Sequence, residues 1–117
     1  MCERPTAPRV SILLPARNAS ATLNACLESI SRQTLPDWEC ILVDDGSTDG
    51  TRGIASAHAG RDDRLRVVPA SGAGLIDALN EGLRRCRAPL VARMDADDLM
   101  HRDRLAAQAH AFEQDPG

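Results

Sequence analysis

The sequence contains no lysine and no tyrosine, and these absences exclude several kinds of catalytic site. Every one of the 14 basic residues is an arginine. The chain therefore cannot form a lysine Schiff base, and it lacks the lysine on which P-loops and receiver domains depend. Only 2 % of the residues are aromatic, so the core must be built from leucine, isoleucine, valine and alanine.

The four cysteines do not form a metal-binding or redox motif. Cys2, Cys26, Cys40 and Cys86 include no Cys-x-x-Cys pair. Cys26 and Cys40 fall on apolar faces, where a free thiol behaves as a small hydrophobic side chain. Reduced thiols are typical of the cytoplasm, and we expect the chain to act there or at the cytoplasmic face of the membrane.

Long hydrophobic runs and basic blocks are also missing. No apolar run approaches about 20 residues and no signal-peptide core is present, so the sequence predicts no transmembrane segment. The net charge is −3, which argues against nucleic acid as a partner. The 117 residues, 43 % of them hydrophobic, suffice for one domain, which we expect over 10–117 after a flexible leader over 1–9.

Short apolar runs alternate with segments of helical periodicity. Strands are predicted over 10–14, 40–43, 65–68 and 90–94, the first stopped by Pro15 and the third by Pro69. Helices are predicted over 21–32, 51–58 and 102–113, the second closed by Gly60, and a further helix carries Leu75, Ile76, Leu79 and Leu83 on one stripe. This order predicts an α/β fold whose mainly parallel sheet is covered by helices on both faces.

The loops after the strands are expected to hold the functional site. The carboxyl ends of parallel strands meet at one edge of a sheet, and ligands bind at that edge. The loops predicted there are 15–18, 44–47, 69–74 and 95–98. Two of these four loops are strongly acidic, and the first offers Arg17 and Asn18.

Three carboxylates, Asp95, Asp97 and Asp98, follow the last predicted strand. In an extended segment, side chains two residues apart face the same way, so Asp95 and Asp97 can converge. A divalent cation offsets their repulsion, and Mg²⁺ is usually held by one or two carboxylates together with substrate phosphates. The alternative is that Asp97 or Asp98 caps the following helix while the other acids are solvated.

A second acidic pair, Asp44 and Asp45, precedes Gly46 and Ser47. A carboxylate in such a turn can accept hydrogen bonds from a nucleotide base or a ribose. The alternative is a turn that contains an Asx motif and a helix cap, which the same residue types also favour.

Five segments resemble the family 2 glycosyltransferases, an inverting group with the GT-A fold. They are 10–18, 31–39, ILVDDGSTDG over 41–50, 78–83 and VARMDADD over 91–98, the last followed by Asp103-Arg104-Leu105. Their order and spacing carry the likeness over almost all of the chain from Val10 to Asp115. The resemblance implies the nucleotide-sugar-binding half of a GT-A domain, with a Rossmann-like sheet that is incomplete on its C-terminal side.

The resemblance assigns roles to the loops at the sheet edge. The loop over 15–17 would line the base, and Asp45 would hydrogen-bond the base edge with Asp44 beside it. Asp97 would coordinate Mn²⁺ or Mg²⁺ between the two phosphates, supported by Asp98, and Asp95 would approach the ribose or the metal. The full set of implied donor-binding residues is Pro15, Ala16, Arg17, Asn18, Asp44, Asp45, Gly46, Ser47, Gly74, Asp95, Ala96 and Asp97.

The implied reaction transfers a sugar from a nucleoside-diphosphate sugar, with UDP favoured, to a hydroxyl of a carbohydrate or lipid-linked acceptor. A single displacement of this kind needs a general base. In the family that base comes later in the chain, so we expect this chain to be the donor-binding half and to be inactive alone. Its sheet would keep an open edge, through which two copies can pair.

Two positions depart from the family pattern. Arg17 stands where many members have an aromatic side chain that stacks on the base, although arginine can stack too. Arg102 replaces a proline that is common at the start of the following helix.

Other functions remain open at this stage. A non-catalytic nucleotide-sugar-binding module would use the same residues. A haloacid-dehalogenase-like phosphatase would use Asp95 as nucleophile and Asp97 as acid/base, but Asp98 and Leu99 follow where a small residue and threonine are expected. A dinucleotide-binding dehydrogenase is disfavoured because Asp77 occupies the place of the third glycine after Gly72-Ala-Gly74.

Overall fold

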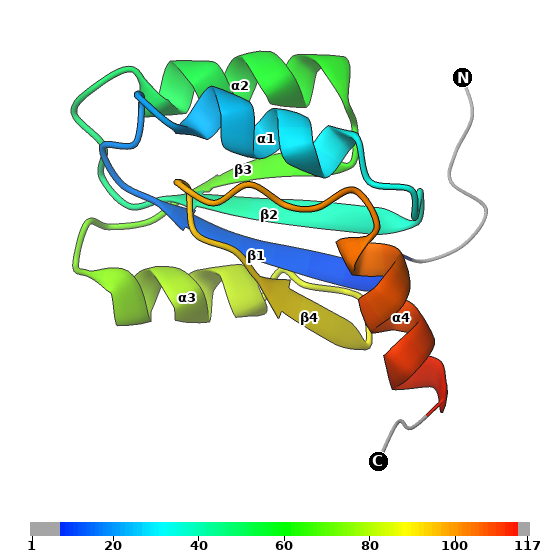
Figure 1. The fold of residues 1–117 in the computed structure, drawn as a ribbon. Helices are drawn as coiled ribbons and strands as arrows, with labels where there is room; N and C mark the ends of the chain where they lie inside the picture. Colours follow the sequence, from blue (N-terminus) through cyan, green and yellow to red (C-terminus); the bar gives the residue numbers. More distant parts are fainter. Residues whose placement is uncertain (1–7, 115–117) are drawn as a thin grey trace.

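Four strands and four helices alternate along residues 8–114, which are the residues that the computed structural model describes (Figure 1). The strands are β1 (Val10–Ala16), β2 (Trp38–Asp44), β3 (Leu65–Pro69) and β4 (Leu90–Arg93). The helices are α1 (Leu23–Ser31), α2 (Thr51–Arg61), α3 (Leu75–Leu83) and α4 (Arg104–Gln114). The strands pair in the order β3-β2-β1-β4, each pair parallel, so the predicted α/β fold is confirmed.

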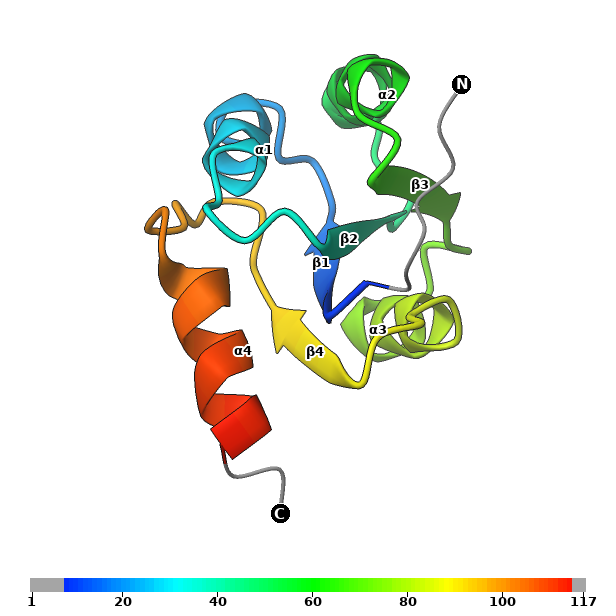
Figure 2. The same cartoon turned by 90° about the vertical axis from the view of Figure 1, so that its right-hand side faces the viewer.

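Helices cover the two faces of the sheet, with α1 and α2 on one face and α3 on the other (Figure 2). Successive side chains of a strand point to opposite faces. Ile12 and Leu14 of β1 accordingly join the larger core cluster beneath α1, to which α4 adds Leu105. Leu13 joins the smaller cluster beneath α3 together with Ile41. The sheet is therefore buried on both faces over its two central strands.

The strand order reverses at β1. The sheet grows through β2 and β3 on one side of β1, and β4 lies on the other side. In open parallel sheets, a crevice forms outside the carboxyl ends of the strands at such a reversal. This topology places the expected binding site beyond the ends of β1 and β4.

Strand β1 continues through Pro15, where the sequence predicted its end. Pro15 pairs in register with Val43 of β2. Pairing with β4 ends at Leu13 and Arg93, where the Met94 amide donates to the Leu13 carbonyl at 3.0 Å. Backbone groups two residues apart face the same neighbouring strand, so the missing N–H of Pro15 falls where β4 has already ended. The proline therefore costs the sheet no ladder hydrogen bond.

The other predicted elements are present with shifted ends. Gly60 was predicted to close α2, but the helix continues to Arg61. Strand β3 includes Pro69, and α4 begins at Arg104, two residues later than predicted.

Most of the apolar stripe predicted on α3 faces solvent, and of its four residues only Leu79 packs against the smaller core cluster. Leu75, Ile76 and Leu83 are 50 %, 74 % and 48 % exposed, whereas the buried residues of the helix are Ala78 and Gly82. Small side chains let the backbone of α3 approach the sheet closely, so contact with the sheet, rather than hydrophobicity, decides which face of this helix is buried.

Strand β4 is an edge strand, although the length and bounding of its apolar run are typical of a buried strand. Ala92 is buried, whereas Val91 is 38 % exposed and the Arg93 side chain is 51 % exposed. Among the described residues, β4 pairs only with β1, and β3 forms the opposite edge. Helix α3 packs mainly against β1 and β2, so the face of β4 that carries Val91 and Arg93 is left partly open, which explains the alternation.

A buried carboxylate, Glu39, ties the amino ends of the strands together. It is 3 % exposed and accepts hydrogen bonds from Ser11 Oγ at 2.6 Å and from the Arg87 amide at 2.7 Å. Ser11 Oγ in turn accepts the Ala88 amide at 3.0 Å, and Arg66 pairs with Glu39 at 3.4 Å. Burial alone raises the pKa of Glu39, but the hydrogen bonds from Ser11 and Arg87 outweigh it and hold the pKa below its ordinary value.

We expect Glu39→Gln to lower the free energy of unfolding by about 1–3 kcal/mol near neutral pH, because hydrogen bonds to a charged group are lost. The folded-state pKa lies below the unfolded one, so the carboxylate stabilises the fold above its unfolded pKa. That stabilisation disappears as the pH falls through the folded-state pKa. Urea unfolding, followed by the fluorescence of the single tryptophan, should show wild type and variant converging at low pH.

The control for this prediction is Glu28→Gln, whose exposed pair with Arg32 should contribute little at either pH. A stability difference between wild type and Glu39→Gln that does not change with pH would contradict the role assigned to the carboxylate.

Most of the predicted leader, residues 1–7, lies outside the described residues. Arg9, its last residue, is held in place, because its amide donates to the Asp37 carbonyl at 2.7 Å and its side chain pairs with Glu113 at 2.8 Å. Within 8–114, none of the helices is sufficiently long and apolar to cross a membrane.

Candidate functional site

A hollow of about 410 Å³ opens at the carboxyl edge of the sheet. Its lining comes from the ends of β1, β2 and β4 and from the start of α3. The lining residues are Pro15, Ala16, Arg17, Asp45, Gly74, Leu75, Arg93 and Asp95. The hollow lies at the reversal of strand order, where ligands bind in sheets of this kind.

Asp45 is the residue of the hollow that most strongly indicates a ligand. It is 5 % exposed, and its Oδ1 is buried without a hydrogen-bond partner among the described residues. A buried polar atom without a partner costs roughly 1–3 kcal/mol, which a donor group on a ligand would recover. Its neighbour Asp44 has a structural role, because Asp44 Oδ1 accepts the Ser47 amide at 3.2 Å. The turn part of the alternative thus holds for Asp44, whereas the helix cap does not, because the N-cap of α2 is Gly50. Asp45 is left available.

Asn18 joins the first loop to the second. Its φ of 50° makes it the one non-glycine residue of 8–114 with positive φ, a conformation that asparagine tolerates better than most residues. The Asn18 amide donates to Ser47 Oγ at 3.0 Å, and its Oδ1 accepts the Thr48 amide at 2.8 Å. These bonds fix the loop that carries Arg17 relative to the loop that carries Asp45.

Gly46 lets the loop after β2 approach the loop after β3. Its φ is 73°, and a Cβ at this position would lie 3.2 Å from the Cα of Gly72. We expect Gly46→Ala to lower the free energy of unfolding by about 1–2 kcal/mol, the cost of a left-handed conformation for an L-residue. Gly50→Ala is the matched control, since φ at Gly50 is −78° and its Cβ would make only an ordinary contact at 3.9 Å. Equal urea midpoints for the two variants would contradict this explanation.

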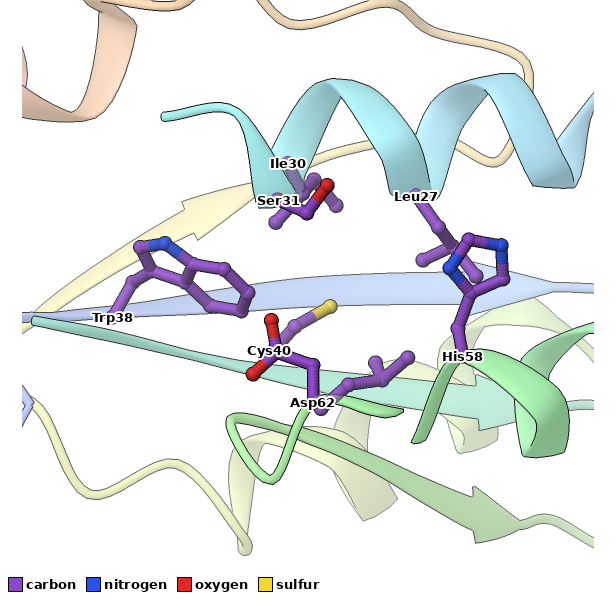
Figure 3. Close-up of a pocket in the computed structure, with 8 residues that line it drawn as sticks. Leu27, Ile30, Ser31, Trp38, Cys40, His58 and Asp62 are labelled. Atoms are coloured by element: carbon purple, nitrogen blue, oxygen red, sulfur yellow. The ribbon is translucent and has the colours of Figure 1, made fainter. Parts of the chain in front are cut away.

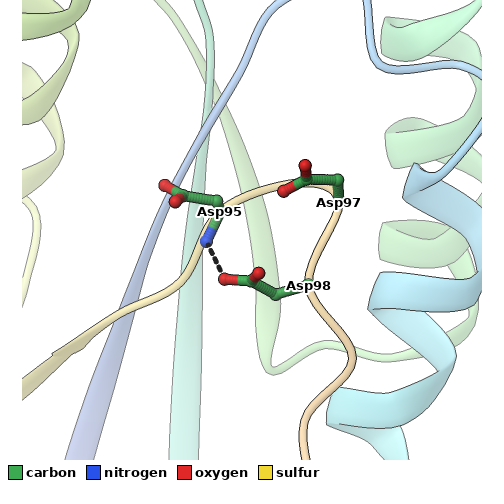
Figure 4. Close-up of side chains that lie close together, drawn as sticks. All are labelled: Asp95, Asp97 and Asp98. Atoms are coloured by element: carbon green, nitrogen blue, oxygen red, sulfur yellow. Dashed lines mark hydrogen bonds between the residues drawn. The ribbon is translucent and has the colours of Figure 1, made fainter.

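The three carboxylates after β4 lie on a tight turn (Figure 4). The Asp98 amide donates to the Asp95 carbonyl at 3.0 Å, and Asp98 Oδ2 accepts the Asp95 amide at 3.1 Å. Asp95, Asp97 and Asp98 are exposed, and one oxygen of each lies within 4.8 Å of the others. The carboxylates converge as predicted, although a turn and not an extended strand brings them together.

The helix-cap alternative for these acids is wrong, because α4 begins only at Arg104. Asp98 closes the turn, and Asp95 pairs with Arg93 at 3.4 Å. The Asp97 carboxylate makes no hydrogen bond within 8–114, so it is the one most available to a cation. Three carboxylates are a donor set that suits hard divalent cations such as Mg²⁺ and Mn²⁺.

A second cavity lies between α1, α2 and the sheet (Figure 3). Its volume is about 20 Å³, which is room for a single water molecule. Trp38 lines it, and the Nε1 of this side chain is buried without a partner among the described residues. Burial raises the pKa of the Cys40 thiol in its wall well above the ordinary value, so this thiol is unreactive at neutral pH. The cavity is too small for a nucleotide.

The structure gathers about half of the predicted site residues around the hollow. Those that line it are Pro15, Ala16, Arg17, Asp45, Gly74 and Asp95. Asn18, Asp44, Gly46 and Ser47 shape the loops, and Ala96 packs in the core. Sequence reasoning missed Leu75 and Arg93, because one counted as part of an apolar stripe and the other as part of a strand. The position of Arg93 two residues before Asp95 was the available signal.

A parallel sheet with a hollow and a carboxylate turn at its reversal point is typical of the GT-A class of glycosyltransferase folds. The profile of glycosyl transferase family 2 matches residues 11–117, and the chain belongs to this family.

Two curated relatives show how much of a family member the chain matches. The chain is 41 % identical over 91 residues to the glycosyltransferase EpsJ of Bacillus subtilis, which is 78 % of this chain and 26 % of that protein. It is 39 % identical over 107 residues to a PGL/p-HBAD biosynthesis glycosyltransferase of Mycobacterium tuberculosis, 91 % of this chain and 42 % of the relative. The chain therefore spans less than half the length of these relatives.

Solved structures confirm the GT-A fold. Residues 1–349 of TarS from Staphylococcus aureus, in complex with UDP-GlcNAc, superpose with a TM-score of 0.84 at 24 % identity, over 91 % of this chain and 31 % of that TarS chain. The mannosyltransferase PcManGT of Pyrobaculum calidifontis, in complex with GDP-Man and Mn²⁺, gives 0.79 at 32 % identity, over 87 % and 31 %. Glucosyl-3-phosphoglycerate synthase of Mycobacterium tuberculosis, in complex with Mn²⁺, UDP and glucosyl-3-phosphoglycerate, gives 0.67 at 31 % identity, over 81 % and 36 %.

Proposed function

We propose that this chain binds the nucleoside-diphosphate sugar donor of a family 2 glycosyltransferase, with UDP-sugars favoured. Asp45 carries the proposal, because it lines the hollow and its buried Oδ1 has no hydrogen-bond partner within residues 8–114. The Asp45 carboxylate would accept a hydrogen bond from a base N–H, and the hollow extends to Asp95 of the acidic turn, residues 95–98. Support comes from two structural relatives that are complexes with Mn²⁺ and a nucleotide.

The base end of the hollow suits a base with a ring N–H. Uracil presents its N3–H between two carbonyls, and guanine presents N1–H, so both can donate to Asp45, whereas adenine and cytosine have no ring N–H on that edge. The Arg17 guanidinium can stack on the base in place of an aromatic side chain. Pro15 and Leu75 add apolar walls on which the ring can rest.

The phosphate end is assigned to the acidic turn. Asp97 would be the principal ligand of Mn²⁺ or Mg²⁺, with Asp95 and Asp98 beside it. Such a cation, when bound, neutralises the charge that develops on the diphosphate leaving group. The Arg93 guanidinium, which pairs with Asp95, adds positive charge at the same end of the hollow.

The complete reaction is proposed to be an inverting single displacement by a hydroxyl of a carbohydrate or lipid-linked acceptor. It requires a general base to take the hydroxyl proton. The relatives are more than twice as long as the segment they share with this chain. We assign the acceptor site and the general base to the part of those proteins that this chain does not match, and we expect the chain alone to bind donor without transferring sugar.

Calorimetric titration of UDP into the folded chain, with and without Mn²⁺, tests this proposal. We expect binding that requires Mn²⁺, with UDP tighter than GDP or dTDP. Tighter binding of GDP would change the assigned base and keep the donor site. If none of the three nucleotides binds in the presence of Mn²⁺, the donor-site assignment is wrong.

Two alternatives are separated by simple assays. A non-catalytic nucleotide-sugar-binding module would show no transferase activity even when this chain replaces the matching region of a full-length relative. Hydrolysis of a phosphomonoester would favour the phosphatase, with Asp95 as nucleophile.

The proposed setting is the cytoplasm or the cytoplasmic face of the membrane. Cys26, Cys40 and Cys86 form no disulfide within the part of the chain that the structure describes, which suits a reducing compartment. Pairing of two copies through the edge of β3 or β4 stays a prediction, which the molecular mass in solution would test.

A further inference from the structure

Four polar side chains form a stripe along one side of α1 and its two flanking segments. Thr22, Cys26, Ser29 and Gln33 follow one another at intervals of four, three and four residues, which places them on one face of a helix. Each of them hydrogen-bonds to the backbone of the segment 95–105. This segment begins with the acidic turn and runs alongside α1, as its orange ribbon shows (Figure 1).

The first two side chains of the stripe hold the acidic turn itself. Thr22 Oγ1 donates to the Ala96 carbonyl at 3.0 Å, and Cys26 Sγ donates to the Asp95 carbonyl at 3.6 Å.

The last two side chains hold the chain that leaves the turn. Ser29 Oγ accepts the Met100 amide at 2.9 Å. Gln33 is 7 % exposed, its Nε2 donates to the His101 carbonyl at 2.7 Å, and its Oε1 accepts the Leu105 amide at 3.0 Å. The acidic turn is thus held from both of its ends by one helix.

Apolar packing alone would not orient the acidic turn in the same way. Met94 and Met100 are 1 % and 5 % exposed and anchor the segment in the core. Apolar contacts are non-directional, so they fix how deep the segment lies without fixing which way its carbonyls and carboxylates point. Hydrogen bonds are directional, and here they orient the backbone on either side of the carboxylates.

We propose that this stripe consists of positioning residues that arrange the carboxylates of the acidic turn before a divalent cation binds. This inference rests on the proposed donor site. With the carbonyls of Asp95 and Ala96 and the amide of Met100 held, the ligand oxygens stay within 4.8 Å of one another. Substitution of the residues that hydrogen-bond to metal ligands typically lowers metal affinity about 10–100-fold. The stripe acts through the backbone, so its effect belongs at the lower end of that range.

Two serines of α1 provide a matched pair of variants. Ser29 and Ser31 each donate to the carbonyl three residues earlier, at 2.6 Å and 2.8 Å, but only Ser29 also accepts a hydrogen bond from the segment after the turn. With UDP present, we expect Ser29→Ala to weaken Mn²⁺ binding about tenfold and Ser31→Ala to leave it unchanged. Thr22→Val, which removes the bond to Ala96, should act like Ser29→Ala.

Mn²⁺ affinity is measured from the paramagnetic resonance signal of free Mn²⁺, and the thermal midpoint is measured separately. Equal Mn²⁺ affinities for Ser29→Ala and Ser31→Ala overturn the inference. A lower midpoint for Ser29→Ala with unchanged Mn²⁺ affinity also overturns it, because the serine then serves only the fold. A wild-type chain that binds neither Mn²⁺ nor UDP contradicts the proposed function first, which distinguishes the two failures.

Discussion

Asp97→Asn is expected to abolish the Mn²⁺-dependent binding of UDP while leaving the fold intact. Asp97 is the carboxylate of the turn that makes no hydrogen bond within 8–114, so its loss takes nothing from the fold. Asparagine keeps the shape and removes the negative charge. Loss of an outer partner of a metal ligand lowers metal affinity about 10–100-fold, and Asp97 is proposed as a direct ligand. We therefore expect the affinity for UDP with Mn²⁺ to fall more than about 100-fold.

Asp103→Asn is the matched control for this experiment. Asp103 lies on the same segment and undergoes the same change of charge, but its carboxylate accepts a hydrogen bond from Thr34 Oγ1 at 3.0 Å and lies outside the cluster. Calorimetry should find wild-type UDP affinity for Asp103→Asn, and both variants should keep the wild-type thermal midpoint. If Asp97→Asn still binds UDP with Mn²⁺ as wild type does, the three acids are only a solvated turn.

Gly82→Ala is expected to lower the free energy of unfolding by about 1–2 kcal/mol, although the same change usually stabilises a helix. Gly82 is buried where α3 crosses the sheet. A Cβ there would overlap Leu13 Cδ1 and lie 2.9 Å from Val43 Cγ2. Leu13 can rotate its side chain, but β-branched Val43 is stiff, so the helix must move away from β2. Overpacking of this kind costs about 1–3 kcal/mol, which exceeds the gain in helix propensity of up to about 1 kcal/mol.

For Gly53→Ala in α2 we expect the opposite effect on the free energy of unfolding. Nothing lies within 4 Å of the position that its Cβ would take, so the gain in helix propensity is not opposed. We expect Gly53→Ala to raise the free energy of unfolding by about 0.5–1 kcal/mol. Urea unfolding followed by Trp38 fluorescence measures both variants. Stabilisation by Gly82→Ala would mean that α3 does not lie as close to β1 and β2 as described.

The Gly82 contact also bears on the functional site. Val43 directly precedes Asp44 and Asp45, and Leu13 pairs with the last residue of β4. A shift of these side chains moves the strand ends that carry the hollow. We therefore expect Gly82→Ala to weaken UDP binding as well, although less than Asp97→Asn does.

The fold class and the location of the site were predictable from the sequence for simple reasons. Apolar runs such as 40–43 are buried on both faces and read as central strands of a parallel sheet. Parallel strands bring their carboxyl ends to one edge, so the loops with Asp45 and Asp95 had to meet there. Asp95, Asp97 and Asp98 are neighbours in the chain, and a tight turn brings their oxygens together with little help from the rest of the fold.

Other features required contacts between residues far apart in the chain. Asp44 and Asp45 are adjacent and chemically identical, yet one closes a turn and the other lines the hollow with a buried oxygen that has no partner among the described residues. No local pattern separates them. Likewise, the stripe on α1 matters only because the segment 95–105 lies beside it, about 70 residues later in the chain.

The sequence by itself thus determined the alternation of strands and helices, the parallel sheet and the acidic loops at its edge, because these follow from local periodicity and from connection rules. The tertiary structure alone decided which face of α3 is buried, that β4 is an edge strand, and which carboxylates remain free for a ligand. Burial and hydrogen-bond partners depend on what packs against a residue, and here those neighbours are α1, the reversal of strand order at β1, and the close approach at Gly82.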